Sequence, residues 1–163
     1  MKYRMLTVEE LKELEKEFIQ FLSSNTITGP DWENIKKNKP QKAEEMLGMF
    51  SDIVMEKALK NIKWAEVITP QSIRTFWFQE KKVSLVGIDI NDSSIDLTKD
   101  PLSKLGKINH GSEPLKIWRT DKEYNVQREE ELWEVLSKGA SIVSAERYKW
   151  LNDLYESTKS SKN

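Results

Sequence analysis

Apolar side chains recur at helical spacing along the first sixty residues of the chain. Separations of three and four place one group of them on a single face of a predicted first helix. This group is Val8, Leu11, Leu14, Phe18, Phe21 and Leu22. Thr7 and Glu10 form the pattern of a capping box, in which each side chain bonds the other's backbone amide. The chain is therefore predicted to begin its folded part with an amphipathic helix.

Two further helices are predicted before the pattern changes. Thr28 and Pro30 mark the start of a short helix that ends near Lys37, because proline suits the first turn. A long helix is predicted over residues 40–62, with an apolar stripe along one side. Gly48 lies inside it, where glycine costs about 1 kcal/mol relative to alanine. We therefore expect close packing at Gly48, against an aromatic ring.

After residue 62 the pattern changes from helical to alternating. Residues 73–79 and 83–90 are rich in β-branched and aromatic side chains and flank the charged connection 80–82, which is typical of a hairpin. Further strands are predicted over residues 63–68, 115–119 and 140–143. A turn or cap is predicted at Asp121, and helices are predicted over residues 126–138 and from Ser144 onward. The expected fold class is α+β, with N-terminal helices, a central antiparallel sheet of three to five strands built on the 73–90 hairpin, and C-terminal helices.

Neither face of the predicted hairpin is clearly polar. Side chains alternate along a strand, so Ile73 and Trp77 share one face while Phe76 and Phe78 share the other. An antiparallel sheet with one solvated face would alternate apolar with polar residues more strictly. Either helices cover both faces, which we favour, or one face is left for a partner.

Composition adds limits to this picture. The chain has 163 residues, which favours a single globular α+β domain over residues 1–156 with a disordered polar tail over 157–163. The net charge is −1, from 26 basic and 27 acidic residues, so strong bulk attraction to nucleic acid is not expected. The chain has no cysteine, no secretory signal pattern and no apolar run that would span a membrane. We expect a cytoplasmic protein.

No motif assigns a catalytic, metal-binding or cofactor-binding residue, and no cofactor is expected. The glycine patterns that cradle phosphates are missing. His110 is the only histidine and lies in a predicted loop over residues 98–114; it could act as a general base, but no nucleophile or orienting carboxylate is identifiable beside it. An acidic run formed by Asp89, Asp92, Asp96 and Asp100 does not match the spacing of a calcium-binding EF-hand loop.

Three functional hypotheses remain open. We favour a non-enzymatic module that binds a protein, or a second copy of itself, because methionine and tryptophan suit adaptable contact surfaces; the candidate partner-binding residues are Met49, Met55, Phe76 and Trp77. The first alternative is an RNA- or ribosome-associated factor, with the candidate residues Trp32, Lys36, Lys37, Lys39 and Lys42. The second is an enzyme with a site in the 98–114 loop. An enzyme is less favoured than a binding module.

Several short segments also carry a resemblance. They are the opening Met1-Lys2-Tyr3-Arg4 with Leu6-Thr7, residues 18–22, Ile27-Thr28, Asp31-Trp32, Phe50-Ser51-Asp52-Ile53-Val54 and Ile95-Asp96-Leu97-Thr98. Together they resemble an uncharacterised family of small bacterial proteins, classed as a domain of unknown function. The resemblance implies a bacterial cytoplasmic protein with no established activity, and it supplies no site residues.

Overall fold

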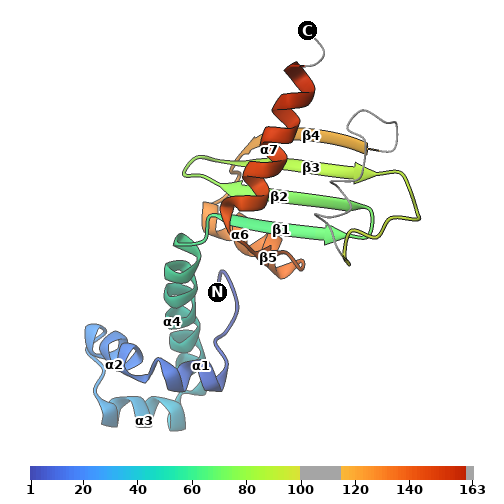
Figure 1. Cartoon of the computed structure of the whole chain (residues 1–163). Helices are drawn as coiled ribbons and strands as arrows, with labels where there is room; N and C mark the ends of the chain where they lie inside the picture. The colour runs from blue at the N-terminus through green and yellow to red at the C-terminus, as the bar shows by residue number, and fades with distance from the viewer. Residues whose placement is uncertain (100–114, 161–163) are drawn as a thin grey trace. The chain divides into compact units, whose positions relative to one another are not determined.

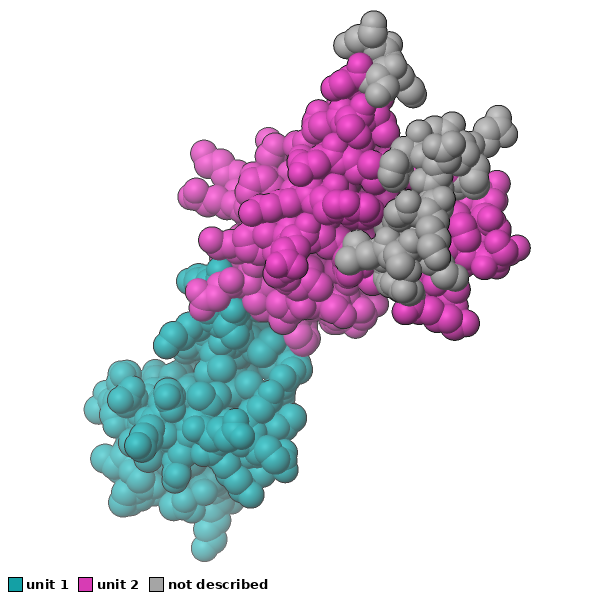
Figure 2. Space-filling view, viewed as in Figure 1, with its two compact units in different colours: residues 1–60 teal, residues 61–163 magenta. Residues whose placement is uncertain are grey.

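The computed structural model describes residues 1–99 and 115–160. The chain divides into two compact units, Met1–Lys60 and Asn61–Asn163, which are coloured separately in Figure 2. We call them the helical unit and the sheet unit. Whether the two fold as one domain, as the sequence suggests, stays a prediction.

The helical unit contains four helices (Figure 1), which are α1 (Val8–Glu13), α2 (Glu15–Ser24), α3 (Gly29–Asn38) and α4 (Pro40–Lys60). Thr7 and Thr28 cap α1 and α3, each in a full capping box. Their hydroxyls satisfy amides that the first turn of a helix leaves without partners. The capping box predicted at Thr7 and Glu10 is confirmed.

The first predicted helix is broken into two. Leu14 ends α1 and precedes α2 with φ −100° and ψ 21°, outside helical geometry. The break lets the two short helices change direction while the apolar spacing continues across it, which is why periodicity alone did not detect it. Beyond the break, Leu22, Ile35 and Met46 pack together as the core of the helices α2, α3 and α4.

The sheet unit is built on five antiparallel strands in the order β4-β3-β2-β1-β5. The strands are β1 (Trp64–Thr69), β2 (Ser72–Phe78), β3 (Lys82–Ile90), β4 (Leu115–Glu123) and β5 (Ser141–Ile142), and the helices are α6 (Arg128–Ser137) and α7 (Ala145–Ser160). The α+β fold class and the antiparallel sheet built on the 73–90 hairpin are confirmed.

Two details of the sheet unit differ from the prediction. Asp121 lies within β4 rather than in a turn, because the strand continues to Glu123 and pairs with the whole length of β3. Its carboxylate accepts from Lys82 Nζ at 2.7 Å, which lowers the pKa of Asp121. Helix α7 continues to Ser160, past the point at which the sequence places a polar tail. Residues 100–114, including Asp100 and His110, lie outside the described residues.

One face of the sheet is closed by α7, which crosses it in Figure 1. Tyr148 and Leu151 of α7 pack against Ile73, Val86 and Ile88 of the central strands. Leu151, Ile73, Val86 and Ile88 have no exposed surface. This face holds the main apolar core of the sheet unit, and we call it the covered face.

Among the described residues, a helix covers the opposite face only at one end. Helix α6 is tied to that end by the Arg128 guanidinium, which donates to the Phe78 carbonyl oxygen at 3.3 Å, and by an ion pair between Lys122 and Glu131 at 2.8 Å. Further along the same face, Phe76 and Leu85 are only half-buried. The expectation that helices cover both faces therefore holds for one face and for part of the other.

A close contact fixes the register of β3 and β4. Trp118 pairs with Gly87 across these strands. A Cβ added at Gly87 would lie 2.3 Å from Trp118 Cζ2, closer than any real side-chain contact. Glycine at this position is therefore required by the indole that lies over it.

We expect Gly87→Ala to lower the free energy of unfolding of the sheet unit by about 1–3 kcal/mol, as overpacking does. The added methyl group would displace Trp118, which the neighbouring strand holds in place. The matched control is Gly29→Ala, where nothing lies within 4 Å of the added Cβ, and its effect should stay within ~0.5 kcal/mol. Urea unfolding with amide exchange of the β3 strand measures both; equal effects would show that the Trp118 contact is not formed.

Candidate functional site

The first six residues are attached to one side of α4. The Asp52 carboxylate accepts from the backbone amide of Lys2 at 2.8 and 2.9 Å and from that of Tyr3 at 3.1 Å. The residue before Asp52, Ser51, is buried, and its hydroxyl accepts from the Leu6 amide at 3.1 Å and donates to the Leu47 carbonyl. Two side chains of α4 thus hold an extended segment that has no regular structure of its own.

A second attachment joins this segment to α1. The Arg4 guanidinium donates to both carboxylate oxygens of Glu10, at 2.7 and 2.6 Å, a bidentate geometry that strengthens a charged hydrogen bond. Glu10 also accepts from the Thr7 amide at 2.8 Å. These bonds, that from Arg4 first, lower the pKa of Glu10 to about 2. The segment is therefore fixed at both of its ends.

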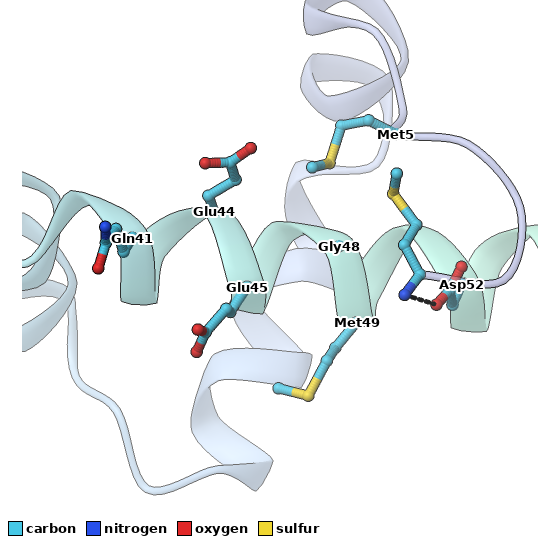
Figure 3. A pocket seen from close by; sticks show the side chains of 8 residues that line it. Met5, Gln41, Glu44, Glu45, Gly48, Met49 and Asp52 are labelled. Carbon is cyan, nitrogen blue, oxygen red and sulfur yellow. Dashed lines mark ion pairs between the residues drawn. The ribbon is translucent and has the colours of Figure 1, made fainter.

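Between the segment and α4 lies an open hollow of about 580 Å³. Figure 3 shows how its lining is arranged around Gly48, with Met5 and Glu44 on one side of α4 and Glu45 and Met49 on the other. The complete lining is Met1, Met5, Gln41, Glu44, Glu45, Gly48, Met49 and Asp52. We call this hollow the methionine groove.

Gly48 keeps the methionine groove open. An added Cβ at this position would lie 4.0 Å from Met5 Cε, an ordinary contact distance. The neighbour is therefore a methionine and not the aromatic ring that the sequence suggested, and it is too distant to require glycine. Glycine lowers the stability of the helix here although no close contact requires it. Its effect is that the floor of the groove has no side chain.

The rim of the groove is apolar and acidic. Met1 is 74% exposed and Met49 is 51% exposed, and Ile53, one turn beyond Met49 on α4, is 55% exposed. Glu44 and Glu45 are exposed and form no ion pair with any of the described residues. Large apolar side chains left in solvent beside free carboxylates mark a surface for a partner that is itself apolar and basic.

The predicted partner-binding residues do not form one surface. Met49 lies on the groove, whereas Met55 is 9% exposed and offers little surface. In the sheet unit, Trp77 packs edge-on against Tyr148 on the covered face, with 5.6 Å between ring centroids. Phe76 is half-buried on the opposite face of the sheet. Only Met49 and Phe76 thus lie on surfaces that are partly open.

The predicted RNA-binding residues lie around the junction of α3 and α4. Trp32 is half-buried and packs edge-on against Phe18, with 5.3 Å between centroids. Lys36 forms an ion pair with Glu33 at 2.6 Å. Lys39 and Lys42 line an adjoining hollow of about 540 Å³ that shares Gln41 and Glu45 with the methionine groove, and Lys37 is exposed. Trp32 therefore has only part of its ring available for stacking.

The acidic run is used in local structure where the structure describes it. Asp92 accepts from the amide and the hydroxyl of Ser94, and Asp96 from those of Thr98, as Asx turns do. These bonds lower the pKa of both carboxyls. Within residues 1–99 and 115–160, no group of three or more His, Cys, Asp or Glu side chains could hold a metal ion.

The groove could not be found from sequence motifs. Its lining joins residues 1 and 5 to positions more than thirty residues further along the chain, and no spacing rule connects them. The available signal was the glycine within a strongly helical segment, beside the exposed Met49. That signal indicated a close contact, whereas the structure leaves an open surface there.

The chain belongs to a family of unknown function (DUF6495), whose model matches residues 1–156. This confirms the resemblance to a family of unknown function. No curated protein and no solved structure matches the chain. No helix in the described part of the chain is long and apolar enough to cross a membrane.

If Gly48 only leaves space, Gly48→Ala should raise the free energy of unfolding of the helical unit by about 0.5–1 kcal/mol, the propensity difference in a helix interior. The nearest atom to the new methyl group would be Met5 Cε at 4.0 Å, so no clash offsets the gain. Urea unfolding followed by far-UV circular dichroism measures the change. A loss of stability would mean that the helix packs more closely at Gly48 than the structure indicates.

Proposed function

We propose that this member of a family of unknown function is a non-enzymatic binding module whose methionine groove holds an apolar, basic segment of a partner protein. The observation that carries the proposal is the open hollow around Gly48, flanked by the exposed Met49 and by two carboxylates without ion pairs among the described residues. The chemistry of the groove fits a partner with an amphipathic helix, of which one face is apolar, as with leucine, and the other is basic, as with lysine.

The side chains of the groove support a peptide ligand. Methionine is flexible and polarisable, so a methionine-lined surface adapts to differently shaped apolar side chains. Amphipathic helices bind such surfaces through apolar anchors at spacings of three and four. Met49 of the groove and Ile53, which lies outside the groove lining four residues further along α4, offer contacts at the same spacing.

Charge supports the basic character of the partner. Glu44 and Glu45 stand on opposite sides of α4 at the groove (Figure 3). Complementary charge speeds the encounter and excludes partners of like charge. Asp52 contributes less, because its carboxylate already accepts from Lys2 and Tyr3.

The lining also favours binding over catalysis. It contains methionine, glutamine, glycine and carboxylates, without a hydroxyl or imidazole side chain, and its one amine, the N-terminal amine of Met1, forms an ion pair with Asp52 at 3.7 Å. Nucleophilic catalysis needs such a group next to a base. The bacterial, cytoplasmic setting that the family resemblance implies is part of this proposal.

The direct test uses a synthetic amphipathic peptide of leucine and lysine, labelled with a fluorophore, and the full chain. We expect binding whose affinity falls about tenfold in Met49→Ser and in Glu45→Lys, in the range of a lost contact at the centre of an interface. Fluorescence anisotropy measures the dissociation constants.

Two substitutions on α2 serve as matched controls. Ile19 is 54% exposed, close to the value for Met49, and Glu17 is an exposed carboxylate that does not line the groove. Ile19→Ser and Glu17→Lys should leave binding unchanged. The proposal is wrong if the peptide fails to bind, or if the α2 substitutions weaken it as much as those on α4. Light scattering would show whether a second copy of the chain occupies the groove instead.

A further inference from the structure

The face of the sheet opposite α7 carries a row of aromatic and basic residues that the methionine groove does not involve. Register places Arg74 opposite Gly87 and Gly87 opposite Trp118, so these three residues lie side by side on one face. Phe76 and Leu85 form the next row on the same face. We call these five residues, together with Lys116 on the same side of β4 as Trp118, the open face.

Trp118 is held flat against the sheet. Its six-membered ring covers Gly87 so closely that an added Cβ would lie 2.3, 2.4 and 2.9 Å from three ring atoms. Next to these ring atoms, the indole Nε1–H donates to Asp89 Oδ2 at 2.7 Å. The ring can therefore neither approach β3 further nor rotate away without losing this bond. One surface of the ring therefore rests on the strand, and the side chain as a whole is half-buried.

Basic side chains flank the indole. Arg74 is exposed on β2, on the far side of Gly87 from Trp118, and Lys116 is exposed two residues before Trp118 on β4. Neither forms an ion pair with any described residue, and the nearby Asp89 carboxylate is already engaged with the indole. The half-buried Phe76 and Leu85 extend the apolar surface beside it.

We propose that the open face binds single-stranded nucleic acid, with Trp118 as the platform for one stacked base and Arg74 and Lys116 as contacts for the adjoining phosphates. A planar ring fixed on a sheet, with cations at its sides, is the arrangement by which sheet surfaces hold unpaired bases. Preorganisation matters here, because a ring that is already immobilised loses little entropy on stacking.

This inference is independent of the proposed function, since it concerns a different unit and other residues. It also differs from an RNA site around Lys36 and Lys37, where Trp32 packs against Phe18. A plot of the logarithm of the association constant against the logarithm of the salt concentration should have a slope of about −1.4. This value follows from two cations in contact with phosphates, because each neutralised phosphate of a single strand contributes about −0.7. A shallow slope agrees with the overall net charge of −1.

The test titrates the full chain with three octamers, of uridylate, of thymidylate and of an abasic sugar-phosphate strand. We expect the first two to bind and to shift the NMR signal of the Trp118 indole N–H, and the abasic strand to bind at least about tenfold more weakly, since stacking supplies much of the affinity. Preference for uridylate would identify RNA as the ligand, and preference for thymidylate would identify DNA; either result supports the inference.

Variants separate this site from others. Arg74→Glu changes an exposed side chain and should weaken binding about tenfold. Trp118→Phe keeps a ring over Gly87 but removes the bond to Asp89, and should weaken binding severalfold. The double substitution Lys37→Glu with Lys39→Glu, on the helical unit, should have no effect.

Three results would overturn the inference. They are equal binding of the abasic strand, loss of binding in the Lys37 and Lys39 variant but not in Arg74→Glu, and an unchanged Trp118 signal at saturating oligonucleotide. If a leucine-lysine peptide shifts the Trp118 signal and the oligonucleotides do not, the open face is a peptide site. That result would also reject the inference of nucleic-acid binding.

Discussion

A β-sheet has two faces because successive side chains of a strand point to opposite sides, and one long helix can cover only one of them. In the sheet unit that helix is α7, and its Leu151 is fully buried against the covered face. The second helix, α6, is tied to the end of the sheet near Phe78 and Lys122. These two helices, the ones that the structure describes in this unit, leave the region around Trp118 uncovered, where half-buried apolar side chains meet solvent. The geometry of the strands thus decides both where the core lies and where a partner could bind.

Much of the sheet unit could be predicted from the sequence, because its signals are local. The run of β-branched and aromatic residues identified the hairpin, and alternation assigned Ile73 and Phe76 to opposite faces. The positions of the helices were beyond such reasoning, since nothing in the alternation of β2 says which face α7 will cover. Asp121 was placed in a turn because aspartate favours turns. Pairing with β3 kept it in the strand, where Lys82 neutralises its charge.

The methionine groove of the helical unit shows a different limit. Capping boxes at Thr7 and Thr28 were visible, at least in part, from residue type and spacing. The attachment of the first residues to Asp52 and Ser51 was not, because it joins positions more than forty residues apart. That attachment creates one wall of the groove. Met49 and Met55 of the long helix were both candidates for partner binding, and the structure separates them, because Met49 is exposed and Met55 is buried.

The central claim is that one face of the sheet is closed and the other is partly open. Solvent paramagnetic relaxation of methyl-labelled protein tests it directly, because Leu85 and Val86 are neighbours on one strand with opposite faces. With a neutral gadolinium chelate in solution, the account predicts clear relaxation enhancement at the methyl groups of Leu85. It predicts almost none at those of Val86 and Ile88, which have no exposed surface. Equal protection of Leu85 and Val86 would contradict it, because the face that carries Trp118 would then be as closed as the one beneath α7.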